Sequence, residues 1–167
     1  RGCAKCSRWR PEMSTLQLPE RSFRRIAALM HSAIGLSFPD SKRPLVASRL
    51  SGRIQRLGLD SFDAYAELLE QPDDGGEFQV AVDLLTTNET YFFREPAHFE
   101  LIERELAATR PAAVHVWSAA SSFGDEAYST AMLLADLQQA GGIGADWSVL
   151  GTDISDRVLH SAVAGIF

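Results

Sequence analysis

The most unusual chemistry in this chain lies in residues 86–95 (TTNETYFFRE), where an amide, several hydroxyls, three consecutive aromatics and one arginine occur together. Arg94 is ionised at any physiological pH, and its planar guanidinium suits a carboxylate. Three adjacent aromatics cannot all face one side of a helix, so we expect part of this surface to contact a ligand or another domain. The alternative for Arg94 is a surface ion pair with Glu95 or another acid.

A second polar stretch combines a predicted strand, a turn of small residues and the start of a helix. Residues 114–118 (VHVWS) favour a strand, residues 118–124 (SAASSFG) are mostly small, and a helical pattern begins at Asp125. In open α/β domains this order brings unpaired backbone N–H groups close to a ligand. Gly124 is the only glycine of the turn, so the segment alone does not exclude an ordinary strand-to-helix connection.

Two acids lie at the ends of these elements. Residues 147–152 (WSVLGT) predict a second strand, and Asp153 follows its carboxyl end. An acid in that position of a dinucleotide-type fold hydrogen-bonds ribose hydroxyls, whereas the alternative role is a helix N-cap. Glu126 lies in the first turn of the preceding helix, where an acid also complements the helix dipole by about 0.3–1 kcal/mol.

Taken in order, these segments resemble the CheR-type chemotaxis receptor methyltransferases. The matching motifs are LTTNETYFFRE (85–95), VWSAASSFGDEAYSTAMLLAD (116–136) and GTDISDRVLHSAVAGIF (151–167), and the resemblance extends from about residue 18 to residue 167. It implies methyl transfer from S-adenosylmethionine to glutamate side chains of chemoreceptors. The implied fold is α + α/β, an amino-terminal helical bundle followed by an incomplete Rossmann-like S-adenosylmethionine-dependent methyltransferase domain.

The same resemblance assigns site residues. The positions implied to contact S-adenosylmethionine are Asn88, Thr90, Arg94, Glu126 and Asp153. Arg94 is also placed near the transferred methyl group, so its implied catalytic role is to hold the incoming glutamate carboxylate in line. Glutamate is already ionised at neutral pH, so the reaction needs alignment rather than acid–base chemistry, and we expect no metal. Two residues depart from the family pattern: Phe123, which has the size to narrow the pocket, and Ala127, which replaces a proline.

Four cations fall on one side of a predicted helix in the first half of the chain. At ~100° per residue they lie within about 60° of one another, and no acid occurs between Ser41 and Leu59. We call this set the basic stripe; its members are Lys42, Arg49, Arg53 and Arg56. A solvated face is the simplest interpretation, but in a protein of net charge −6 the segregation favours an acidic partner. In the resembled family this helix helps to dock glutamate-rich receptor helices, and the absence of interleaved aromatics disfavours nucleic acid.

The expected organisation has four parts. They are a disordered leader over 1–17, a helical domain over 18–95, a connector helix within 96–112, and the first part of the methyltransferase domain over 113–167. Apolar spacing predicts helices around 23–30 and 46–57, a third over 62–69 capped by Asp60 or Ser61, a fourth over 77–87 and a fifth over Pro96–Thr109.

Composition favours a cytoplasmic protein. No apolar run approaches the ~20 residues of a membrane span, so we expect no membrane insertion, and the first dozen residues lack the apolar core of a secretory signal. Cys3 and Cys6 form a CxxC without further zinc ligands and are interpreted as incidental.

Only two strands are predicted, whereas the resembled family continues with more, so we expect the amino-terminal portion of a larger enzyme. The competing hypotheses are a truncated, non-catalytic receptor-docking module and a small helical nucleic-acid binder.

Overall fold

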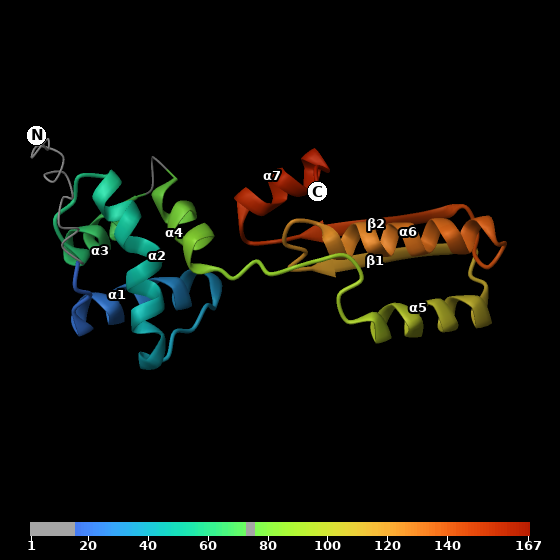
Figure 1. The fold of residues 1–167 in the computed structure, drawn as a ribbon, viewed down its shortest axis with the longest axis horizontal. Coiled ribbons are helices and arrows are strands. Elements are labelled where there is room, and N and C mark those ends of the chain that lie inside the picture. The colour runs from blue at the N-terminus through green and yellow to red at the C-terminus, as the bar shows by residue number, and fades with distance from the viewer. Residues whose placement is uncertain (1–15, 73–75) are drawn as a thin grey trace, which may run out of the picture. The chain divides into compact units, whose positions relative to one another are not determined.

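The structure is a computed structural model that describes residues 16–72 and 76–167. Its elements, shown in Figure 1, are α1 (Glu20–Ile34), the short 3₁₀ helix η1 (Asp40–Lys42), α2 (Arg43–Arg56), α3 (Phe62–Glu70), α4 (Glu77–Leu85), α5 (Pro96–Thr109), β1 (Ala113–Ala119), α6 (Asp125–Gln139), β2 (Asp146–Thr152) and α7 (Asp156–Ala164). The leader predicted over 1–17, with Cys3 and Cys6, lies outside the described residues except for positions 16 and 17. The chain divides after Phe78 into two compact units, which are described separately.

The first unit buries apolar side chains that recur at helical spacing. The buried hydrophobic residues of α1, α2 and α3 are Phe23, Ile26, Met30, Val46, Leu50, Ile54, Phe62, Tyr65, Ala66 and Leu69. The apolar spacing predicted around residues 46–57 is therefore confirmed at Val46, Leu50 and Ile54. Leu57 is the exception, with 37% of its surface exposed, because α2 ends at Arg56 and Gly58 turns the chain in the left-handed region.

The ends of the helices follow local side-chain chemistry. Ser61, rather than Asp60, caps α3, since its Oγ accepts the Ala64 N–H at 3.2 Å. The predicted helix Pro96–Thr109 is confirmed with proline in its first turn. The fourth helix ends at Leu85, before the predicted Thr87, although the Thr86 N–H still donates to the Val82 carbonyl at 3.0 Å.

A partly buried ion pair joins α2 to the start of α4. The Arg53 guanidinium donates to both carboxylate oxygens of Glu77, with Nη2 to Oε2 at 2.5 Å, and the buried Tyr65 hydroxyl donates to Glu77 Oε1 at 2.7 Å. The hydrogen bond to Glu77 raises the pKa of Arg53. Burial raises the pKa of the Tyr65 phenol, and its hydrogen bond to Glu77 raises it further. The helix of the basic stripe thus has an acidic neighbour, supplied by a different helix.

A more exposed ion pair joins α1 to α3. The Arg25 guanidinium donates to both carboxylate oxygens of Glu70, with Nη2 to Oε2 at 2.7 Å and Nε to Oε1 at 3.0 Å. These hydrogen bonds lower the pKa of Glu70 below its ordinary value. Because solvent screens an exposed pair, breaking it should cost less stability than breaking the Arg53–Glu77 pair.

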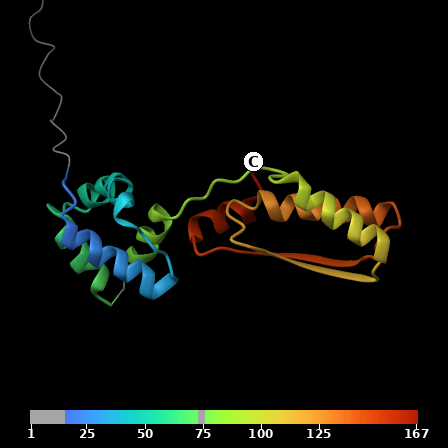
Figure 2. The ribbon, with the colours of Figure 1, turned by 90° about the horizontal axis from the view of Figure 1, so that it is seen from below.

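The second unit contains a parallel strand pair with α6 as its crossover. Ala113 pairs with Asp146, and the register continues to Ala119 opposite Thr152. One face of the pair packs against α5 and α6; the side chains that meet there are Leu106, Val114, Val116, Leu133, Leu134, Leu137, Trp147 and Val149. Figure 2 shows α5 and α6 on the same side of the two strands. On the other face Trp117 and Leu150 are 68% and 62% exposed.

No helix in the part of the chain that the structure describes is long and apolar enough to cross a bilayer.

Candidate functional site

The turn between β1 and α6 is held in an unusual backbone conformation at the carboxyl ends of both strands. Ala120 and Ser122 have φ of 57° and 52°, a region that residues other than glycine rarely adopt and that is often found at functional sites. The Ser121 N–H donates to the Thr152 carbonyl at 2.9 Å, which ties the turn to β2. Gly151 permits this approach, because a Cβ there would lie 2.9 Å from Ser121 Oγ.

Arg94 and Glu126 line one cavity of about 220 Å³ between α5, β1 and α6. The full lining is Arg94, His98, Phe99, Ile102, Val116, Trp117, Ser118, Glu126 and Thr130. Ser118 Oγ donates to Glu126 Oε1 at 2.6 Å, which orients the carboxylate at the end of β1. Among the described residues Arg94 makes no ion pair with Glu95, so the structure does not support that alternative. A fixed cation and an oriented carboxylate therefore face one small cavity.

Asp153 lies at the carboxyl end of β2 and accepts two backbone hydrogen bonds. Its Oδ2 accepts the Ser122 N–H and its Oδ1 accepts the Ser155 N–H, both at 2.9 Å. Ser155, not Asp153, is the residue that precedes the first turn of α7. The bond to Ser155 is thus a local turn, and Asp153 is fixed against the β1–α6 turn with its carboxylate only partly exposed.

The segment of residues 86–95 approaches the same turn without regular secondary structure. The Asn88 carbonyl accepts a hydrogen bond from Ser122 Oγ at 3.1 Å, and the Asn88 side chain donates to Thr86 Oγ1 at 3.4 Å. Thr90 is half-buried in this segment. The structure therefore groups Arg94 with Glu126 in one cavity and connects Asn88 to Asp153 through Ser122.

Phe92 and Phe93 of the segment contact different parts of the unit. Phe92 makes an edge contact with Phe167 at 4.9 Å between ring centroids, and Phe93 makes one with Phe99 at 5.2 Å. All three aromatics of the segment retain substantial exposed surface. Phe123 does not line the Arg94 cavity; its ring lies 5.3 Å from the guanidinium carbon of Arg157.

Sequence reasoning missed several residues of the cavity. Ser118 and His98 were not assigned a role, although each lies close in the chain to an assigned residue. Ser118 lies on the same, less exposed face of β1 as Val114 and Val116, and His98 lies in the first turn of α5, four residues after Arg94. Strand alternation predicts that face for Ser118 but not its neighbours, because these depend on how α5 packs beside β1.

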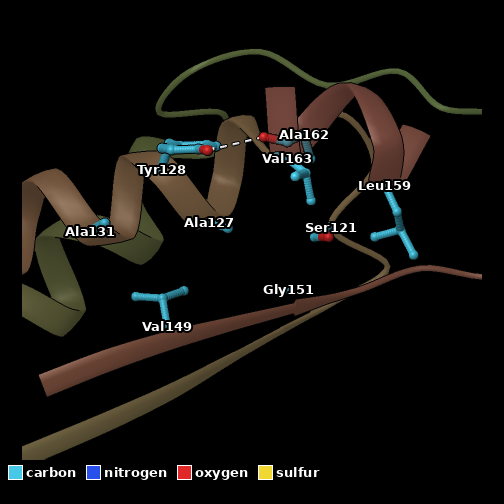
Figure 3. A pocket seen from close by; sticks show the side chains of 10 residues that line it. Ser121, Ala127, Tyr128, Ala131, Val149, Gly151, Leu159, Ala162 and Val163 are labelled. Carbon is cyan, nitrogen blue, oxygen red and sulfur yellow. Dashed lines mark hydrogen bonds between the residues drawn. The ribbon is translucent and has the colours of Figure 1, made fainter. Parts of the chain in front are cut away.

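A second cavity, of about 350 Å³, lies between α6, α7 and β2 (Figure 3). Ala127 and Val163 are among its lining residues, none of which is charged. Tyr128 and Ala162 also line it, and the Tyr128 hydroxyl donates to the Ala162 carbonyl oxygen at 3.0 Å. An uncharged lining does not suit a zwitterionic ligand. Ala127, the second departure from the family pattern, thus faces this cavity and not the one with Arg94.

The basic stripe lies in the first unit. Lys42 ends η1, and the three arginines lie on α2. Lys42 and Arg56 are exposed, whereas Arg49 is half-buried and Arg53 is held by Glu77. From sequence, Arg53 is predicted to be one of the partner-binding cations; in the structure its guanidinium has an intramolecular partner, because α4 places Glu77 beside it.

Comparisons with known proteins match two successive parts of the chain to two domain models. The model of the CheR methyltransferase all-alpha domain matches residues 21–86, and that of the CheR methyltransferase SAM binding domain matches residues 88–167. Chemotaxis protein methyltransferases of Escherichia coli (strain K12), Salmonella typhimurium and Vibrio cholerae are 43%, 42% and 35% identical to the chain. The alignments cover 91%, 91% and 93% of this chain, but 52%, 52% and 58% of those relatives.

The chain therefore spans a little over half the length of these curated relatives. Within that span the two domains of one family follow each other in the chain, and they meet at residues 86–88, just after α4. An all-α unit followed by an incomplete Rossmann-like, S-adenosylmethionine-binding unit is the fold that the sequence predicts, and it is confirmed. The chain belongs to the CheR methyltransferase family.

Proposed function

We propose that the protein containing this chain transfers the methyl group of S-adenosylmethionine to glutamate side chains of chemoreceptors, and that Arg94 and Glu126 bind the methionine part of that methyl donor. The observation that supports this most directly is their shared cavity. The amino-acid end of S-adenosylmethionine has an ammonium and a carboxylate, which Glu126 and Arg94 complement in charge. Asp153, at the end of β2, is proposed to accept from the ribose hydroxyls, and Asn88 and Thr90 to contact the cofactor from the linking segment.

The reaction needs no proton transfer. A lone pair of the glutamate carboxylate forms the new oxygen–carbon bond, while the carbon–sulfur bond breaks and its electrons neutralise the sulfonium. Because the nucleophile is already ionised at neutral pH, the protein must supply alignment and a dry, charged surrounding. A guanidinium that forms two hydrogen bonds to a carboxylate fixes the orientation of that carboxylate and also supplies a positive charge beside it.

Methyl ester formation has a chemical signature that tests the proposal. We expect protein made from the longest reading frame that contains this sequence to transfer label from [methyl-³H]S-adenosylmethionine to a chemoreceptor, with the label released as methanol in mild base. Esters release methanol under these conditions, whereas methylated lysine or arginine does not. Receptor binding without labelling would instead favour the non-catalytic docking module, and base-stable labelling would contradict glutamate as the acceptor.

We further propose that the exposed part of the basic stripe docks glutamate-rich receptor helices. Lys42 and Arg56 lie near opposite ends of α2 and are both exposed. The chain has 22 acidic and 16 basic residues, so a cationic helix face in it attracts an acidic helix while the rest of the surface repels it.

Reversing the two exposed cations, in Lys42→Glu/Arg56→Glu, should weaken binding of a glutamate-rich helical peptide roughly tenfold at low salt, with the difference shrinking as salt screens exposed charges. Calorimetric titration at two ionic strengths measures this. Arg21→Glu/Arg104→Glu changes the net charge equally at exposed positions outside η1 and α2, and should bind like wild type. Equal losses in both double variants would show that net charge alone, and not the stripe, governs binding.

A further inference from the structure

Two serine hydroxyls fix the ends of the segment that leads to Arg94. Ser122 Oγ donates to the Asn88 carbonyl at 3.1 Å, and Ser129 Oγ accepts the Phe93 N–H at 2.9 Å. Both serines belong to the β1–α6 region, and both are buried. Between their two attachment points the chain has no helix or strand of its own. These two hydrogen bonds are therefore specific attachments of an otherwise irregular segment to the candidate cofactor-binding unit.

Each serine is itself oriented by a second hydrogen bond. Ser129 Oγ donates to the Asp125 carbonyl at 2.6 Å, which leaves its lone pairs directed to the Phe93 N–H. The Ser122 N–H donates to Asp153 Oδ2, so one residue contacts both the segment and the acid at the end of β2. Neither serine hydroxyl can rotate freely without breaking one of these bonds.

The backbone on both sides of Arg94 shows why such attachment matters. Phe93 and Glu95 have φ of 55° and 57°, so Arg94 lies between two residues in the left-handed region, which side chains disfavour. Such a conformation persists where surrounding contacts determine it, and here the contacts are the Ser129 bond and the packing of Phe93 on Phe99. Arg94 then extends into the cavity that Glu126 lines.

We infer that Ser122 and Ser129 are positioning residues for methyl transfer, which we call the serine clamp: they hold the segment of residues 88–93 so that Arg94 faces the cofactor. The inference rests on the proposed function. Neither serine lines the Arg94 cavity, so the effect of the clamp on Arg94 is transmitted through the backbone of the segment. Ser129 sets the backbone directly before Arg94, while Ser122 couples the Asn88 end of the segment to Asp153.

The test is a double-mutant cycle on S-adenosylmethionine binding, measured by calorimetry on protein from the longest reading frame that contains this sequence. Ser129→Ala should weaken binding roughly fivefold, the loss typical of one hydrogen bond. In an Arg94→Ala background the same change should weaken it less than twofold, because a residue that acts through Arg94 has nothing left to position. Ser51→Ala is the matched control, since Ser51 Oγ also donates to the carbonyl four residues earlier at 2.6 Å; it should bind normally.

Ser122→Ala provides a second arm if Ser129→Ala folds poorly. It keeps the N–H that Asp153 accepts and removes only the bond to the Asn88 carbonyl, and it should weaken binding without lowering the melting temperature appreciably. Amide exchange by NMR adds a readout that does not depend on function: the Phe93 amide should exchange several times faster in Ser129→Ala. An equal loss of affinity in both Arg94 backgrounds, or unchanged affinity in both serine variants, would overturn the clamp. A wild-type protein that binds no S-adenosylmethionine would instead overturn the proposed function.

Discussion

Replacing Arg94 with alanine is expected to reduce methyl transfer by on the order of a hundredfold or more while leaving the fold intact. Once a substrate carboxylate is bound and desolvated, removing its arginine partner costs about 2–5 kcal/mol. The side chain belongs to an irregular, exposed segment and not to a packed core. Its loss should therefore affect the reaction much more than the stability. Initial rates of labelling, with circular dichroism on the same samples, measure both.

Arg94→Lys separates charge from geometry. A lysine keeps the positive charge but cannot form two parallel hydrogen bonds to one carboxylate, so we expect only partial recovery of the rate. The kinetic constants also indicate which carboxylate Arg94 holds. A raised KM for S-adenosylmethionine places Arg94 on the cofactor, whereas an unchanged KM with a lower kcat places it on the incoming glutamate. Near-normal turnover by Arg94→Ala would refute both roles.

The second large effect concerns stability. Arg53→Met should lower the free energy of unfolding by about 3 kcal/mol, the low end for breaking a buried ion pair, because Arg53 retains some exposed surface. The variant removes the guanidinium from the Glu77 side chain, which is only 12% exposed and which still accepts the Tyr65 hydroxyl. Urea unfolding followed by far-ultraviolet circular dichroism measures the loss.

Two further variants identify the cause. Arg53→Met combined with Glu77→Gln also removes the carboxylate charge that Arg53 balances in the wild type, so it should recover part of the stability lost in the single variant. Arg25→Met breaks the more exposed pair with Glu70 and should have a clearly smaller effect. Similar losses in Arg53→Met and Arg25→Met would show that burial of Glu77 contributes nothing special.

The sequence predicts the elements of this fold better than their contacts. Helix Pro96–Thr109 and the starts of α4 and α6 are where local patterns place them, because proline, acidic first turns and apolar spacing act over a few residues. The role of Arg53 was not predictable in this way. Its partner lies in a different helix, and only tertiary packing brings Glu77 to it.

The candidate site shows the same contrast between residues that local patterns identify and contacts that only tertiary packing creates. Motifs single out Arg94 and Glu126 separately, but their shared cavity depends on α5 lying beside β1. Ser122 and Ser129 have no distinctive spacing, and small polar residues are common in turns and early helices. Their importance follows from the positive φ values of Phe93 and Glu95, which no periodicity in the sequence reports.

The register of the strand pair has a consequence for the order in which the chain folds. Ala113 must meet Asp146 across the whole of α6 before the sheet exists, and pairing between such distant residues is slow to form. The residues of α1, α2 and α3 leave the ribosome well before those of β2. The helical unit can therefore complete its core during synthesis, before β2 has emerged, and its exposed cations are in place while the cofactor-binding unit is still forming.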